Sequence, residues 1–185
     1  EKNPIAKMTM ENGGAVEIEL SPKDAPITVE NFVNLVNSGF YNGLTIHRIV
    51  PGFVIQGGDP MGNGMGGSDK KIKGEFLENG VANNLKHTKG VISMARAFDP
   101  NSASSQFFIV LETSPMVSYS LDGKYAGFGT VISGMDVVDE IAKAETDAND
   151  MPLDEISDFM RGREVEKIEQ KLRIQQQKVE KKLCE

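Results

Sequence analysis

Side chains that commonly carry acid–base or nucleophilic chemistry are few and scattered in this chain. The composition includes only two histidines, His47 and His87, and no serine stands in the G-x-S-x-G sequence of a nucleophile elbow. The histidines lack the spacing of zinc ligands, and Asp59, Asp69 and Asp99 occupy separate loops without an EF-hand pattern. The sequence therefore predicts neither a hydrolase triad nor a metal site.

A glycine-rich stretch could support a second kind of chemistry, because Gly62, Gly64 and Gly67 form a G-x-G-x-x-G pattern. That pattern binds a dinucleotide when it joins a strand to a helix. Residues 68–74 have no helical apolar periodicity, so the required helix is missing. We therefore expect no nucleotide and no other cofactor, and we interpret the stretch as a long loop on the rim of a groove.

Strands are predicted where apolar residues alternate with polar ones, which is the period-two pattern of half-buried strands. The pattern occurs at residues 6–10 and 16–20, on either side of an Asn-Gly-Gly turn, and predicts a β-hairpin. Nineteen glycines and eight prolines favour many short elements over a helical bundle. Further strands are expected at 44–50, 53–56, 91–95, 106–111 and 127–132.

Two helices are predicted, one early and one late. Thr28 is placed to cap the first helix, whose apolar residues within 29–36 follow helical spacing and whose end is marked by Gly39. The second helix is expected at residues 135–144. Together these elements predict a mainly β fold, a closed antiparallel barrel of the eight-stranded type with its two ends capped by the helices.

From Glu155 onward the composition changes, since apolar residues recur at mostly helical intervals among Lys, Arg, Glu and Gln. We predict one domain at residues 1–154 and a charged amphipathic helical tail at 155–185, without the apolar strand that would close a barrel. The helix would either pack one stripe on its own domain or form a coiled-coil contact that mediates self-association. Gln175 falls on the apolar seam and weakens the coiled-coil alternative.

The overall composition argues against several classes of partner. A net charge of -7 disfavours nucleic acid, and no apolar run approaches the roughly 20 residues that a membrane span requires. Cys184 is the only cysteine, so packing alone must stabilise the fold, and a reducing compartment, the cytoplasm, is expected. The alternative is export, with a signal removed during processing.

Two long stretches are not explained by composition: residues 47–59, and residues 90–96 running on to 105–109. They closely resemble the two signature blocks of cyclophilin-type peptidyl-prolyl isomerases, enzymes that catalyse cis/trans rotation of the peptide bond before proline. The run 95–103 resembles bacterial members in particular. The resemblance covers residues 4–154, with further matches at 31–32, 121–129 and 134–138.

The resemblance implies an active site that acts on proline-containing polypeptides without covalent chemistry. Rotation is slow because nitrogen lone-pair delocalisation gives the C–N bond double-bond character, with a barrier of about 18 to 20 kcal/mol. A fixed guanidinium group binds the pyramidal proline nitrogen of the twisted state more strongly than the planar nitrogen. By the resemblance, Arg48 is that donor and the catalytic residue.

The same resemblance implies a preformed slot for the proline ring, built from Phe53, Phe108 and Leu121. Tyr125 lies on the rim of the groove. Neighbouring residues on a strand face opposite ways, so we expect Phe107 in the core and Phe108 in the slot.

Polar residues beside the slot complete the predicted site. Gln56 and Gln106 are amides on otherwise apolar strands, where an unsatisfied polar group is costly. We interpret them as ligands of substrate carbonyls or as supports for Arg48. The backbone at Ala95 and Arg96 is expected to hold the residue before proline in an extended conformation. Both histidines are interpreted as structural.

Two departures from the family pattern concern a known inhibitor. Ser120 stands where cyclosporin-sensitive relatives carry Trp, and the chain has no tryptophan at all. Tyr125 occupies a position that is often His. Both differences leave the proline slot intact, and they predict weak binding of cyclosporin.

Two other classes of function stay open on the sequence alone. The first is a proline-peptide binding module without catalysis, although the presence of Arg48, Phe53 and Gln56 argues against it. An isomerase assay on a short Ala-Pro peptide separates that module from an enzyme. The second is an interaction protein that acts through the C-terminal helix, which light scattering with and without residues 155–185 would test.

Overall fold

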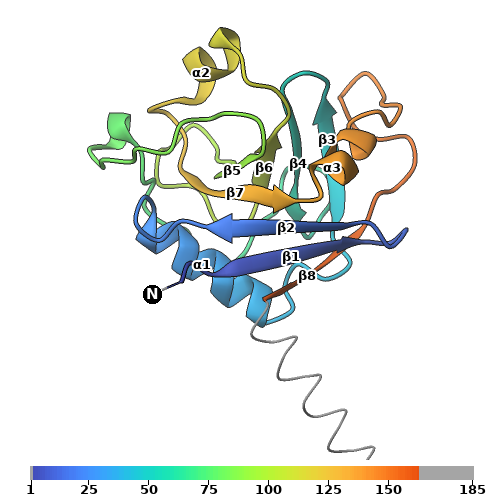
Figure 1. The fold of residues 1–185 in the computed structure, drawn as a ribbon, viewed down its shortest axis with the longest axis horizontal. Helices are drawn as coiled ribbons and strands as arrows, with labels where there is room; N and C mark the ends of the chain where they lie inside the picture. Colours follow the sequence, from blue (N-terminus) through green and yellow to red (C-terminus); the bar gives the residue numbers. More distant parts are fainter. Residues whose placement is uncertain (1, 163–185) are drawn as a thin grey trace, which may run out of the picture.

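The computed structural model describes residues 2–162, which form one curled sheet with short helices at its ends (Figure 1). The hairpin and the later strands predicted from the sequence are present, with small shifts at their ends. The elements of this part of the chain are β1 (Ile5–Met10), β2 (Ala15–Leu20), α1 (Pro26–Asn37), β3 (Thr45–Val50), β4 (Val54–Asp59), the 3-10 helix η1 (Leu77–Asn79), β5 (Val91–Met94), β6 (Phe107–Val110), α2 (Pro115–Leu121), β7 (Gly127–Ser133), α3 (Met135–Ile141) and β8 (Asp158–Gly162).

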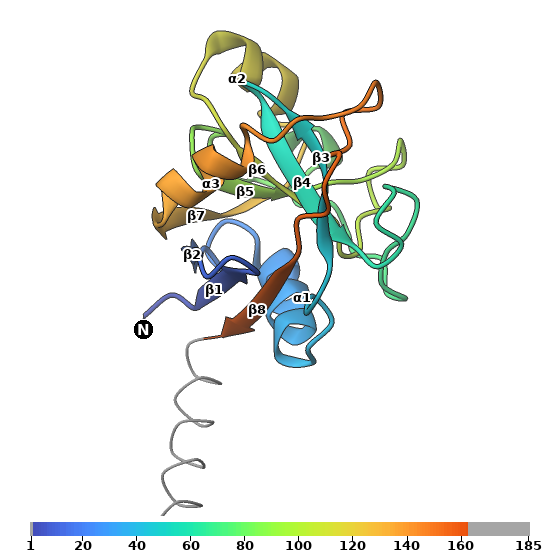
Figure 2. The same ribbon diagram turned by 90° about the vertical axis from the view of Figure 1, so that its right-hand side faces the viewer.

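The eight strands follow the order β3-β4-β6-β5-β7-β2-β1-β8 in the sheet. Among the described residues, the edge strands β3 and β8 are linked by one isolated bridge, from Thr45 to Ser157, and not by a ladder. The prediction of a closed barrel is therefore wrong, and the sheet is a curled half-barrel. The chain before β8 runs past β3 and makes scattered hydrogen bonds with it, such as Ile46 N–H to Ile156 O at 2.8 Å, without adopting a strand register (Figure 2).

Strand β8 corrects a second prediction, that the chain after Glu155 is helical and supplies no closing strand. Asp158–Gly162 pairs antiparallel with β1, with Met8 opposite Met160. Met160 is buried, and its strand is only 5 residues long, too short for the period-two pattern to stand out. The strand falls inside the predicted tail, whose remainder at 163–185 lies outside the described residues, so its predicted helix is not tested.

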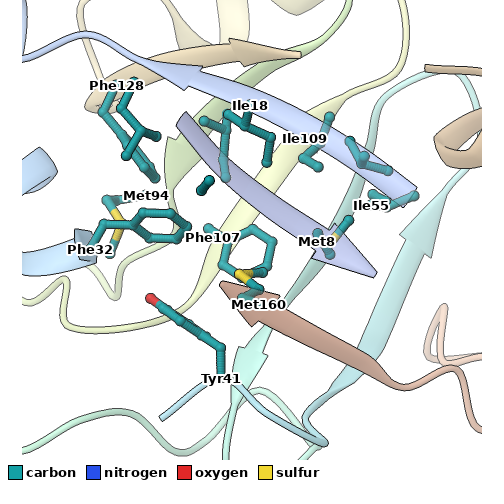
Figure 3. Packing of buried hydrophobic residues seen from close by; sticks show 14 of the residues in the cluster. Met8, Ile18, Phe32, Tyr41, Ile55, Met94, Phe107, Ile109, Phe128 and Met160 are labelled. Carbon is teal, nitrogen blue, oxygen red and sulfur yellow. The ribbon is translucent and has the colours of Figure 1, made fainter. Parts of the chain in front are cut away.

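The main core lies between the concave face of the sheet and α1, and it is rich in aromatic rings (Figure 3). The Phe32 ring lies 5.0 Å from that of Phe128 and 5.2 Å from that of Tyr41. Tyr41 donates its hydroxyl hydrogen to the Ser105 carbonyl at 2.8 Å, which satisfies its one buried polar group. Burial of each ring stabilises the folded protein by about 2 to 3 kcal/mol, so this cluster holds the sheet in its curled form.

Helix α1 begins earlier than predicted and is capped from a distance. Its first turn starts at Pro26, so Thr28 lies inside the helix and is not the N-cap residue. The Glu75 carboxylate, which is 2% exposed, accepts hydrogen bonds from the Thr28 N–H at 2.6 Å and from its hydroxyl at 2.7 Å. A carboxylate at the N-terminal end of a helix accepts a hydrogen bond from an N–H that has no partner within the helix. Its negative charge also interacts favourably with the positive end of the helix dipole. The loop that carries Glu75 is thereby fixed to the helix.

Three α-helices occur in the described residues, one more than predicted, and α2 is the helix that was missed. Ser114 caps it by accepting the Val117 N–H at 3.2 Å, and Pro115 occupies the first turn. Only Val117 and Leu121 are buried, so its 7 residues show too little periodicity for a prediction. Helices α1 and α2 lie at opposite ends of the molecule, with the sheet between them (Figures 1 and 2).

Candidate active site

The predicted catalytic and binding residues meet on the convex face of the sheet, because they occupy one row across neighbouring strands. Arg48 of β3 pairs with Gln56 of β4, Gln56 pairs with Phe108 of β6, and Phe108 pairs with Ser93 of β5. Directly opposed residues of antiparallel strands point to the same face. The register therefore brings together residues that are far apart in sequence, and Phe107 falls on the other face, in the main core, as predicted.

A chain of hydrogen bonds fixes the Arg48 guanidinium from one side. Its Nη1 donates to Gln56 Oε1 at 3.2 Å, and Gln56 Nε2 donates to Gln106 Oε1 at 2.9 Å. Gln106 Nε2 in turn donates to the carbonyls of Gly64 at 3.0 Å and Gly66 at 2.7 Å. A guanidinium has five N–H donors. Among residues 2–162, the guanidinium of Arg48 forms one hydrogen bond, the one to Gln56 Oε1. The other donors are free to meet a ligand in the adjoining depression of about 430 Å³.

The glycine-rich loop at the end of this chain is fixed by Asp59, which the sequence did not identify as part of the site. The Asp59 carboxylate is 1% exposed and accepts the N–H groups of Met61 at 2.8 Å, Asn63 at 3.1 Å and Gly64 at 2.6 Å. Burial alone would raise the pKa of Asp59, but these backbone donors together with that of Gly66 lower it. The loop is a rim of the groove, as expected, and a support for Gln106.

The three residues predicted for the proline slot gather in a second apolar cluster, separate from the main core. Phe108 and Leu121 are both buried in it, and Phe53 packs against it while partly exposed. The Tyr125 ring meets the Phe108 ring edge-on at 5.7 Å. Ser120 precedes Leu121 at the end of α2 and is partly exposed. The missed helix α2 therefore supplies one wall of the predicted slot.

His87 supports the Phe108 ring from behind, at 6.1 Å and nearly parallel. Its Nδ1 donates to Asp122 Oδ1 at 2.9 Å, so that Nε2 accepts the Ser93 hydroxyl hydrogen at 2.8 Å. Burial lowers the pKa of His87, although Asp122 acts to raise it. His87 is thus a neutral, fully hydrogen-bonded anchor, in keeping with its interpretation as structural. Ser93 and Asp122 were not predicted, because a serine in an apolar strand carries no signal by itself.

His47 precedes Arg48 on β3 and is also buried, with 5% of its surface exposed. Burial lowers the pKa of this imidazole more than the nearby Asp59 carboxylate raises it. The ring is therefore neutral at pH 7, and the charge beside the groove belongs to Arg48.

Arg96 is held by contacts within the protein, unlike Arg48. Its Nε and Nη2 donate to the Lys124 carbonyl at 3.2 Å and 2.7 Å. The guanidinium also lies 4.9 Å from the centre of the Phe76 ring and 4.6 Å from that of Tyr125. The neighbouring Ala95 N–H donates to the Gln106 carbonyl at 3.0 Å. The side chain of Arg96 shapes the groove, and its backbone lies along it.

Within residues 2–162, no group of three or more His, Cys, Asp or Glu side chains is arranged to hold a metal ion. Among the helices described, none is long and apolar enough to cross a membrane.

Comparison with known proteins identifies relatives of this arrangement. The sequence model of the family described as cyclophilin type peptidyl-prolyl cis-trans isomerase/CLD matches residues 5–158. The peptidyl-prolyl cis-trans isomerase ppi1 of Schizosaccharomyces pombe is 44% identical over 142 residues, covering 76% of this chain and 87% of the relative. The peptidyl-prolyl cis-trans isomerase CYP18-2 of Arabidopsis thaliana is 41% identical over 152 residues, covering 81% and 88%.

A solved structure has the same fold. The cyclophilin-type peptidyl-prolyl cis-trans isomerase of Cryptosporidium parvum, crystallised in the presence of the dipeptide Ala-Pro, superposes with a TM-score of 0.74 at 31% identity, covering 85% of this chain and 97% of the other. The relatives named here are eukaryotic, so they lend no support to the bacterial-like subgroup expected from residues 95–103.

Proposed function

We propose that this chain, which belongs to the cyclophilin-type peptidyl-prolyl cis-trans isomerase family and is an isomerase, uses Arg48 as its catalytic group. The twisted peptide bond places a lone pair on the proline nitrogen, which the planar bond does not offer to a donor. An N–H of Arg48 donates to that nitrogen and so stabilises the twisted state selectively. The observation that supports this role is the guanidinium held by Gln56 with its other donors open to the groove.

Positioning of Arg48 falls to the two glutamines. An arginine side chain has many rotamers, and one fixed by hydrogen bonds before the substrate arrives loses little entropy in the reaction. Gln56 accepts from Arg48, while Gln106 holds Gln56 and is itself held by the glycine-rich loop. Gln56 Nε2 keeps one N–H that can bind a substrate carbonyl, whereas both N–H groups of Gln106 are donated to Gly64 and Gly66.

The proline ring occupies the apolar surface formed by Phe53, Phe108 and Leu121, with Tyr125 at its rim. Phe108 is rigid because its ring is packed on both sides, which favours a preformed slot. The residue before proline lies along the backbone of Ala95 and Arg96. The dipeptide Ala-Pro named with the Cryptosporidium structure supports proline peptides as the ligand class.

Further expectations about partners are part of the same proposal. Ser120 lacks the indole ring and N–H of tryptophan, so cyclosporin binds weakly, and a titration of Ser120→Trp against the unchanged protein would test this. The acidic chain acts in the cytoplasm on exposed proline segments, without nucleic acid or membrane, and the segment 163–185 mediates any self-association. Cell fractionation and light scattering address these two points.

The test of the catalytic assignment is Arg48→Ala in a protease-coupled assay on a short Ala-Pro peptide. Loss of one preorganised charged donor should lower kcat/KM on the order of a hundredfold. Lys89→Ala removes another cation, exposed and paired with Asp139 away from the groove, and serves as the control. An unchanged rate for Arg48→Ala, with an intact thermal midpoint, would overturn the assignment.

A further inference from the structure

The chain contains four Asn-Gly pairs, a dipeptide with a chemistry of its own. The pairs are Asn12-Gly13, Asn42-Gly43, Asn63-Gly64 and Asn79-Gly80. In such a pair the backbone nitrogen of glycine can attack the side-chain carbonyl carbon of asparagine, because glycine has no side chain to hinder the approach. The nitrogen must give up its proton to react, so a pair whose glycine N–H is held in a hydrogen bond reacts more slowly.

Three of the four pairs are protected in this way. The Gly13 and Gly80 N–H groups each donate at 2.9 Å to the carbonyl of the residue three positions earlier in the chain. The Gly64 N–H donates at 2.6 Å to the buried carboxylate of Asp59. Each of these glycine nitrogens must break a hydrogen bond within the protein before it can attack.

The fourth pair lies in the turn between α1 and β3 and has no such protection. The Leu44 N–H donates to the Tyr41 carbonyl at 3.2 Å, which closes a four-residue turn. Asn42 and Gly43 are the central residues of this turn, and both are exposed. Within residues 2–162 the Gly43 N–H forms no hydrogen bond, and no atom lies within 4 Å of the position that a Cβ of Gly43 would occupy. The nitrogen is therefore open to solvent and free to react.

The carbonyl group of the Asn42 side chain is also prepared for attack. Its Oδ1 accepts the N–H of Met160 in β8 at 3.2 Å. Attack on the carbon places negative charge on this oxygen, and a fixed N–H donor stabilises that charge. Asn12 and Asn63 also accept a backbone N–H, each from the residue two positions later at 2.9 Å. Among the described pairs, the combination of such a donor with an unbonded glycine N–H is found at Asn42.

We propose that Asn42 is a site of spontaneous deamidation. The Gly43 nitrogen bonds to the side-chain carbonyl carbon of Asn42, the bond from that carbon to Nδ2 breaks, and the proton from the glycine nitrogen leaves with Nδ2 as ammonia. The resulting five-membered cyclic imide takes up one water molecule and opens at either of its two carbonyl groups. One product is aspartate. The other is isoaspartate, in which the backbone runs through the former side chain.

The isoaspartate product loosens β8. The hydrogen bond from the Met160 N–H to Asn42 joins β8 to the turn, and β8 is an edge strand of 5 residues. Isoaspartate adds a methylene carbon to the backbone between α1 and β3 and so displaces the accepting oxygen, whereas aspartate keeps an oxygen on the side chain. A short edge strand that loses such a contact opens more easily than the centre of the sheet.

The experiment follows the four pairs in the full chain by peptide mapping with mass spectrometry, during incubation at neutral pH in the folded state and in urea. In the folded protein Asn42 should convert about fivefold faster than the other three, the factor that one net hydrogen bond contributes. Urea removes the hydrogen bonds, so the four sites should then convert at similar rates. Conversion of another site as fast as Asn42 in the folded protein, or an equal lead of Asn42 in urea, would overturn the inference.

The consequence for β8 is tested with Asn42→Gln, whose longer side chain forms the cyclic imide far more slowly. The unchanged protein should unfold at a lower temperature after the incubation than before it, whereas Asn42→Gln should keep its thermal midpoint. Asn12→Gln is the matched control, because it alters an exposed pair with a bonded glycine N–H, and it should lose stability as the unchanged protein does. Conversion of Asn42 to isoaspartate with an unchanged midpoint would overturn the loosening of β8. None of these measurements depends on isomerase activity.

Discussion

Arg48 and Arg96 border adjoining depressions, yet their guanidinium groups have different surroundings. Arg48 makes a single hydrogen bond, to Gln56, among the described residues. Arg96 donates to the carbonyls of Lys124, Ala97 and Phe98 and is stacked between two aromatic rings. The first arrangement leaves donors for a substrate, whereas the second uses the donors to hold the chain together.

The difference shows that residue type and a place in the groove do not decide the role of an arginine. What decides it is how many donors the protein itself satisfies. A catalytic guanidinium must be fixed on one side and open on the other, because its work is done by a donor that the free enzyme leaves unused. Arg96 already uses four of its five N–H donors within the protein, so its contribution is to keep the wall formed by Tyr125 in place.

The largest effect expected on stability is that of Arg96→Ala. The variant loses charge-assisted hydrogen bonds and stacking on Phe76 and Tyr125, and should be destabilised by about 2 to 3 kcal/mol. Urea denaturation measures the change, with Arg48→Ala as the matched comparison, expected within about 0.5 kcal/mol of the unchanged protein. A similar loss of unfolding free energy in the two variants would show that the two guanidinium groups do not differ in their contribution to stability.

A smaller effect, on activity alone, is expected for Gln56→Leu. Leucine fills similar space but no longer accepts from Arg48, so the guanidinium samples other rotamers. We expect kcat/KM to fall about tenfold, mainly through kcat, with the free energy of unfolding little altered. Steady-state kinetics on the Ala-Pro peptide gives both constants. A loss confined to KM would mean that Gln56 binds substrate and does not position Arg48.

The smallest effect is the pH dependence of the free energy of unfolding, to which the histidines contribute and the arginines do not. Burial lowers the pKa of both His47 and His87 in the folded protein, so the folded state binds fewer protons than the unfolded state below about pH 6.5. The free energy of unfolding should therefore fall as pH drops from 7.5 to 5, while Arg48 and Arg96 stay charged throughout. Urea denaturation at several pH values tests this, and His87→Gln should flatten part of the slope. A flat profile for the unchanged protein would contradict it.

Local patterns in the sequence were sufficient for most of the sheet and for the identity of the site. Period-two alternation predicted β1 and β2, and further strands were expected where β3 to β7 lie. Neighbouring side chains of any strand face opposite ways, which placed Phe107 and Phe108 on opposite faces. The blocks around Arg48 and Phe108 indicated the family, since they combine residue types that composition alone does not require. These inferences depend on residues close together in the chain.

The tertiary structure alone decided which distant segments meet. Strand β8 pairs with the edge that β1 offers, and its buried Met160 is too little apolar signal for the strand to be predicted from the sequence. The curl of the sheet brings the Asp59 loop against Gln106. Hydrogen bonds between segments far apart in sequence leave no periodic pattern in it. The sequence therefore identified Arg48, but it did not show that most N–H donors of Arg48 are unused whereas those of Arg96 are bonded within the protein.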